Sequence, residues 1–190
     1  MDSKGQGQAR PSIILDRDGV INEIVWRQGL ISSPRTLSEL KVRQDFRQFM
    51  GAISTFDFGL LVASNQPDVK RGHLSSGALD AITQDLHSQF PAIIEFAYCT
   101  HDDSDHCQCR KPKPGLVQTL IDKHGLARGQ TIFCGDSHKD VLAAQAAGIK
   151  SAFLLTSYNH DSLQHCRPDL ILTRVVDLIP FVTQMQLQEV

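Results

Sequence analysis

The chain has 190 residues, of which 41% are hydrophobic and 21% are charged, and its formal net charge is −2. This length favours one domain, and the small net charge gives no electrostatic basis for binding nucleic acid or a membrane surface. No apolar stretch reaches the roughly 18 residues that a membrane span needs.

The N-terminal segment and the cysteine content indicate a cytoplasmic protein. Residues 1–11 are polar and rich in Gly and Gln, so we expect a disordered tail before a single domain over residues 12–190. The tail lacks the apolar run of a secretory signal. Five cysteines, an odd number, then point to a reducing compartment and favour metal binding over disulfides.

Short apolar runs alternate with helical patterns along the chain. We expect strands at residues 12–15, 59–63, 93–98, 131–134, 151–155 and 170–172. We expect helices around residues 46–56 and 79–90, between Pro114 and Gly125, between Ser137 and Gly148, and over about 175–186. Such β-α alternation predicts an α/β three-layer sandwich with a central parallel sheet.

Two carboxylates follow the first expected strand. Asp16 and Asp18 stand where the chain must turn, and Gly19 follows them. The carboxyl ends of parallel strands form the ligand crevice of an open α/β sheet, so these acids are candidates for chemistry. An Asx-turn closed by Gly is the alternative interpretation.

Two further strand ends carry polar side chains. Asp136 follows the fourth expected strand and, paired with Asp16, is a candidate Mg²⁺ ligand, because Mg²⁺ prefers hard oxygen donors. Ser64, followed by Asn65 and Gln66, offers a hydroxyl to a phosphoryl oxygen, although this segment is also an ordinary turn sequence.

A cysteine and histidine cluster lies in a polar loop at about residues 99–109. Cys99, His101, Cys107 and Cys109 supply the four ligands of a tetrahedral zinc site, with His106 as a substitute for His101. A site with four protein ligands has no open position, so the predicted Zn²⁺ is structural. Free thiols near a surface loop are the alternative interpretation.

Two cations follow the zinc loop directly. Arg110 and Lys111 precede Pro112, and prolines restrict the backbone around them. Arg110 has the donor geometry to bind phosphate oxygens in pairs, whereas Lys111 acts as a point charge. A solvated basic turn is the alternative interpretation.

In this order, the motifs resemble the haloacid dehalogenase superfamily of phosphatases, from about residue 12 to the end of the chain. The segments that carry the resemblance are Asp16-Arg17-Asp18-Gly19, Ser64-Asn65-Gln66, Cys109-Arg110-Lys111-Pro112 and Gly135-Asp136-Ser137. They look most like the D-glycero-D-manno-heptose 1,7-bisphosphate 7-phosphatases. Histidinol-phosphate phosphatases share several of these motifs and remain an alternative.

The resemblance implies a role for each acid. Asp16 would be the nucleophile that forms an aspartyl-phosphate, and Asp18 would be the general acid and base, which requires a raised pKa. Mg²⁺ would be held by Asp16, Asp136 and the main-chain carbonyl of Asp18. Ser64 and Lys111 would bind the transferring phosphoryl group.

The resemblance also implies the surroundings of the site. Asn65, Gln66 and Arg110 would bind substrate, Asp140 would orient Asp136 and Lys111, and residues 20–35 would form a small flap in place of a cap domain. The implied protein is a monomer that acts on a phosphorylated sugar in nucleotide-activated heptose synthesis. A non-catalytic phosphate-binding protein, a zinc-dependent interaction module and a mutase-type transferase are alternatives from other classes.

Overall fold

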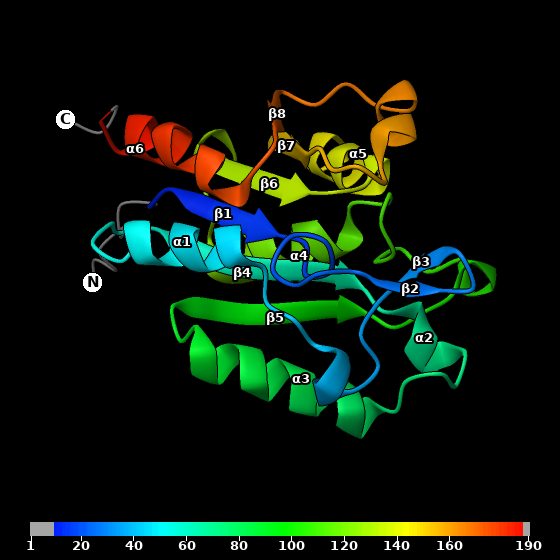
Figure 1. Cartoon of the computed structure of the whole chain (residues 1–190). Helices are drawn as coiled ribbons and strands as arrows, with labels where there is room; N and C mark the ends of the chain where they lie inside the picture. Colours follow the sequence, from blue (N-terminus) through cyan, green and yellow to red (C-terminus); the bar gives the residue numbers. More distant parts are fainter. Residues whose placement is uncertain (1–9, 188–190) are drawn as a thin grey trace, which may run out of the picture.

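A six-stranded parallel sheet forms the centre of the protein (Figure 1). The structure, a computed structural model, describes residues 10–187. The strands lie in the order β5-β4-β1-β6-β7-β8. Their bounds are β1 Ser12–Leu15, β4 Gly59–Asn65, β5 Ile93–Cys99, β6 Thr131–Gly135, β7 Lys150–Leu154 and β8 Leu170–Leu172. The predicted parallel sheet is therefore confirmed, with ends shifted by at most two residues.

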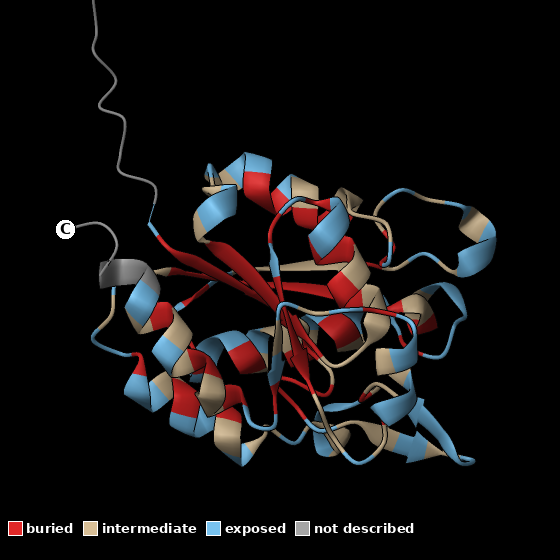
Figure 2. Ribbon diagram, turned by 90° about the horizontal axis from the view of Figure 1, so that it is seen from above, coloured by how far each residue is buried: buried red, intermediate tan, exposed pale blue. Residues whose placement is uncertain are grey.

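Helices cover both faces of the sheet. One face carries α1 Gln44–Ala52, α3 Ser76–Gln89 and α6 Ile179–Leu187, and the other carries α4 Gly115–His124 and α5 His138–Ala146. Successive residues of β1 serve opposite faces, since Ile13 and Leu15 belong to one core cluster and Ile14 to the other. Buried strands between partly exposed helices give the predicted three layers (Figure 2).

The helix ends follow the local signals. Ser137 and Asp140 form the expected capping box at the start of α5. Gly125 and Gly148, at the predicted ends of two helices, have φ of 60° and 70°. The shorter helices are α2 Pro67–Lys70 and the 3-10 turns Leu37–Glu39, Asp103–Asp105, Arg128–Gln130, His160–Gln164 and Val175–Leu178.

The segment expected as a flap contains a small β-hairpin. Strand β2, Val25–Arg27, pairs in antiparallel fashion with β3, Leu30–Ser32. Gln28 and Gly29 close it with φ of 51° and 77°. Two consecutive positive φ values match the twist of a tight hairpin.

Pro11, the last residue of the expected tail, lies at the start of the sheet. Pro11 is buried and accepts a hydrogen bond from Gly59 N at 2.9 Å, so the ordered sheet begins beside it. Residues 1–9 lie outside the described part of the chain. Among residues 10–187, no helix has the length and apolar character to cross a membrane.

Candidate active site

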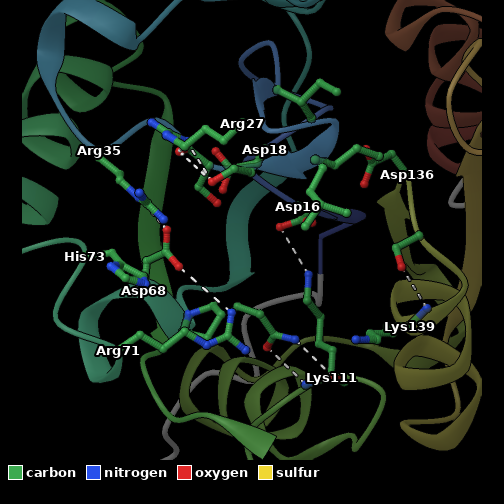
Figure 3. Close-up of a pocket in the computed structure, with 18 of the residues that line it drawn as sticks. Asp16, Asp18, Arg27, Arg35, Asp68, Arg71, His73, Lys111, Asp136 and Lys139 are labelled. Carbon is green, nitrogen blue, oxygen red and sulfur yellow. Dashed lines mark hydrogen bonds and ion pairs between the residues drawn. The ribbon is translucent and has the colours of Figure 1, made fainter.

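Three central strands deliver the candidate catalytic groups to one edge of the sheet. Asp16 follows β1, Ser64 is the second-to-last residue of β4, and Asp136 follows β6. Strand β1 lies between the other two. A cavity of about 900 Å³ opens at this edge and is lined by Asp16, Asp18, Lys111 and Asp136, among others (Figure 3). The predicted gathering of Asp16, Asp18 and Asp136 is therefore observed.

Lys111 is buried at the base of the site, with 2% of its surface exposed. Its Nζ lies 3.1 Å from Asp16 Oδ1 and 2.5 Å from Asp140 Oδ1. It also donates to Ala63 O at 2.8 Å. Burial opposes the charge of Lys111, but the two carboxylates raise its pKa overall. The ammonium group is thus a fixed cation beside the candidate nucleophile.

Carboxylates crowd around Asp16. Burial raises the pKa of Asp16 to about 6, with Lys111 opposing the rise, and burial next to Asp16 raises the pKa of Asp136 well above its ordinary value. Ligand oxygens of Asp16, Asp136 and Asp140 all lie within 4.8 Å of one another. Asp140 is already engaged, because its Oδ2 also accepts from Ser137 N at 3.0 Å. Repelling, desolvated acids of this kind fit a divalent cation bound by Asp16 and Asp136.

The environment of Asp18 differs from the expectation. Burial would raise its pKa, but Arg17 and hydrogen bonds from Asn22 and Gln66 lower it overall. Arg17, itself fully buried, donates to Asp18 Oδ1 at 3.1 Å and to Oδ2 at 3.0 Å. The expectation of a raised Asp18 pKa is therefore wrong for the free protein, because a paired guanidinium stabilises the carboxylate.

The end of β4 and the residue after it position catalytic groups. Asn65 exchanges two hydrogen bonds with the main chain of Lys111, at 3.0 and 3.1 Å. Gln66 is fully buried and donates to Asp18 Oδ2 at 2.7 Å and Ser64 Oγ at 3.1 Å. Ser64 in turn hydrogen-bonds to Asp16. Gln66 is not among the residues that line the cavity, and its amide is held by Asp18 and Ser64, so its substrate contact stays a prediction.

The four predicted zinc ligands converge. The sulfur atoms of Cys99, Cys107 and Cys109 lie 3.0–3.7 Å apart. His101 Nδ1 lies 3.6 Å from Cys99 Sγ and 3.3 Å from Cys109 Sγ. His106 is not part of this cluster. Four soft donors at such separations fit one tetrahedral Zn²⁺ at about 2.3 Å from each sulfur.

Four arginines line the cavity, and each pairs with a carboxylate: Glu39, Asp68, Asp102 or Asp103. Arg27 of the hairpin, Arg35, Arg71, His73 and Arg110 line the cavity, and Figure 3 shows Arg35, Arg71 and His73 on the side away from Asp136. Asp68 is the carboxylate that lines the cavity among them, and Arg35 Nε donates to it at 2.8 Å. Of these residues, only Arg110 was expected at the site.

These features define a phosphatase of the haloacid dehalogenase-like class, a phosphoric monoester hydrolase. A family model described as "HAD-hyrolase-like" matches residues 108–178. A D-glycero-beta-D-manno-heptose-1,7-bisphosphate 7-phosphatase of Neisseria meningitidis serogroup A is 30% identical over 186 residues, covering 93% of this chain and 95% of that protein. The protein of the same name from Pseudomonas aeruginosa is 31% identical, covering 78% of this chain and 83% of that protein. The chain therefore belongs to the family of these bisphosphate phosphatases.

A solved structure agrees with this assignment. The D,D-heptose 1,7-bisphosphate phosphatase of B. bronchiseptica, complexed with magnesium and phosphate, has a TM-score of 0.79 and 25% sequence identity. The match covers 95% of this chain and 99% of that one. The similarity thus extends over nearly the whole chain and favours an enzyme over the non-catalytic alternatives.

Proposed function

We propose that this protein removes the 7-phosphate of D-glycero-D-manno-heptose 1,7-bisphosphate, in the synthesis of nucleotide-activated heptose. The named relatives support this substrate, and one observation on the cavity carries the proposal further. Asp16 and Asp136 lie at one end, whereas Arg35, Arg71 and His73 lie at the other. The four arginines that line the cavity each pair with a carboxylate. A guanidinium group has five N–H donors, more than one carboxylate occupies, so these arginines suit a ligand with a second anionic group.

The same arginines argue against histidinol phosphate as the preferred substrate. Histidinol phosphate has an imidazole, and no second phosphate, at the end remote from its phosphate. The imidazole offers no phosphate oxygens to accept hydrogen bonds from Arg35 and Arg71, so these residues would not favour its binding. A sugar bisphosphate would instead place a phosphate there.

In the proposed reaction, Asp16 attacks the 7-phosphorus. A bond from its carboxylate oxygen to phosphorus forms, and the bond from phosphorus to the sugar oxygen breaks. Asp18 gives its proton to the leaving oxygen, then takes one from the water that releases inorganic phosphate and restores Asp16. Arg17 keeps Asp18 ionised in the free protein, so Asp18 must be protonated when the dianionic phosphate arrives and raises its pKa. Lys111 and Ser64 hold the phosphoryl oxygens.

Two metals complete the proposal. Mg²⁺ would be held by Asp16, Asp136 and the main-chain carbonyl of Asp18, and when bound it shields the anions that must approach each other. Zn²⁺ would be held by Cys99, His101 and the two cysteines that follow. The loop that holds these ligands continues directly into Arg110 and Lys111, so zinc binding that orders the loop also positions these two side chains.

Phosphate release from a panel of substrates tests the proposal. The panel holds both anomers of the heptose 1,7-bisphosphate, fructose 1,6-bisphosphate and histidinol phosphate, each with Mg²⁺. We expect the highest kcat/KM for a heptose bisphosphate and no turnover by Asp16→Asn. Faster hydrolysis of histidinol phosphate than of every sugar would overturn the substrate proposal, and turnover by the variant would overturn the role of Asp16.

A variant pair tests the arginines of the cavity. Arg110→Met removes a cation that lines the cavity, whereas Arg47→Met removes one that bonds to Gln89 outside it. We expect the first change to raise KM for the bisphosphate by about tenfold or more, the effect of losing a charge-assisted hydrogen bond, with little change for a sugar monophosphate. The Arg47 variant should match the wild type. An equal loss on both substrates in Arg110→Met would contradict recognition of a second phosphate.

A further inference from the structure

The loop after β7 holds Asp136 at two points. The Tyr158 hydroxyl donates to Asp136 Oδ2 at 2.8 Å, and Asn159 Nδ2 donates to the main-chain oxygen of Asp136 at 2.8 Å. Asn159 also donates to Leu154 O, at the end of β7, at 2.9 Å. The loop therefore fixes both the backbone and the carboxylate of a proposed magnesium ligand.

The turn that contains Asp16 and Asp18 packs against the hydrogen bond between Tyr158 and Asp136. Gly19 has φ of 83°, and a Cβ built on it would lie 2.0 Å from Asp136 Oδ2 and 2.8 Å from Tyr158 Oη. No side chain fits in this space. The turn, the carboxylate and the phenol are thus in direct contact, and each restricts the movement of the others.

Tyr158 also contacts the flap. Its ring meets that of Trp26, in strand β2, edge to face, with centroids 6.3 Å apart and an interplanar angle of 87°. Trp26 is 58% exposed and is the single tryptophan of the chain. A continuous set of contacts therefore runs from the hairpin through Tyr158 to Asp136.

We propose that Tyr158 is a positioning residue for Asp136 and that, through Trp26, it couples the flap to occupancy of the magnesium site. This rests on the proposed Mg²⁺ site but not on the identity of the sugar. The phenol has one proton to donate, and donating it to Oδ2 limits rotation of the carboxylate beside Asp16. A ligand that is already oriented loses less conformational freedom on binding the cation, so it binds more tightly.

Magnesium titrations of three variants test the proposal. Tyr158→Phe keeps the ring against Trp26 but removes the donor, and Trp26→Phe keeps the donor but alters the flap contact. Tyr98→Phe changes the other tyrosine of the chain, whose hydroxyl lies 2.9 Å from Thr83 Oγ1. Binding is followed by the rise of the melting temperature with Mg²⁺ and, where Trp26 is present, by its emission. The melting temperature without Mg²⁺ checks that each variant folds.

We expect Tyr158→Phe to raise the Mg²⁺ midpoint by about tenfold or more, the usual loss when a group that supports a metal ligand is removed. Its kcat at saturating Mg²⁺ should fall by a much smaller factor than the midpoint rises. A variant that is only less stable would not show a specific loss of Mg²⁺ affinity with kcat retained. Tyr98→Phe should keep the wild-type midpoint, and Trp26→Phe should shift it by less than Tyr158→Phe does, because coupling between two sites is reciprocal. Trp26 emission should change as Mg²⁺ binds.

Each other outcome overturns a defined part of the proposal. An unchanged midpoint in Tyr158→Phe would remove the positioning role. If Mg²⁺ raises the melting temperature but leaves Trp26 emission unchanged, the proposed coupling of the flap to the magnesium site is wrong. No response of the wild type to Mg²⁺ by either method would reject the metal site itself, whichever sugar the enzyme hydrolyses.

Discussion

Asp16→Asn should stabilise the metal-free protein while abolishing catalysis. The pKa of Asp16 rises from 3.8 to about 6 in the folded protein, mainly through burial. A rise of roughly two units corresponds to about 3 kcal/mol of unfavourable free energy near neutral pH. This figure already includes the attraction of Lys111, which lowers the pKa. Loss of the hydrogen bond that Ser64 gives to the carboxylate offsets about 1 kcal/mol. The gain that remains, about 2 kcal/mol, should raise the melting temperature by about 4–8 °C in a chain of this size.

The assay is thermal unfolding of both proteins with a chelator over a range of pH. A carboxyl whose pKa is raised by folding costs stability as pH rises from 3.8 to about 6, so the two proteins should differ above this window and converge below it. With saturating Mg²⁺ the order should reverse, because the wild type alone keeps the full ligand set. A less stable variant in chelator near neutral pH would refute the electrostatic argument.

Three further outcomes follow from other contacts. Gly19→Ala should weaken Mg²⁺ binding by at least about tenfold, measured by titration, because its Cβ would lie 2.0 Å from Asp136 Oδ2; wild-type affinity would contradict the packing described. Arg17→Met should lower the free energy of unfolding in urea by about 3–5 kcal/mol, because Asp18 loses its buried partner; a change near zero would argue against that pair. Cys107→Ser should reduce bound zinc, measured by elemental analysis, and lower the melting temperature; full zinc content would exclude this residue as a ligand.

Parts of the site with a local signal were predictable. Asp16 and Asp136 each follow an apolar run, and parallel strands place their carboxyl ends at one edge of a sheet, so the two acids had to lie near each other. The cysteine cluster is predictable for a different reason. Cys99 and Cys109 lie within one short loop, which limits how far apart their sulfur atoms can be.

Parts that depend on the path of a side chain were not predictable. Arg17 stands between two acids in the sequence, and nothing local shows that its guanidinium is buried against Asp18 and lowers that pKa. Tyr158 reaches Asp136 only because β6 and β7 are neighbours. The hairpin was expected only as a flap, because Gln28 adopts a positive φ that its residue type does not signal.

The two halves of the cavity wall differ in how firmly they are built. The reacting groups stand on central strands of the sheet, whereas Arg27 stands on a hairpin of two three-residue strands, a unit that is marginal by itself. Hydrogen exchange should therefore be fast in the hairpin and slow in β1. Mutations in the hairpin can alter which molecules are accepted at little cost to folding, so substrate range can evolve there while the hydrolytic chemistry stays unchanged.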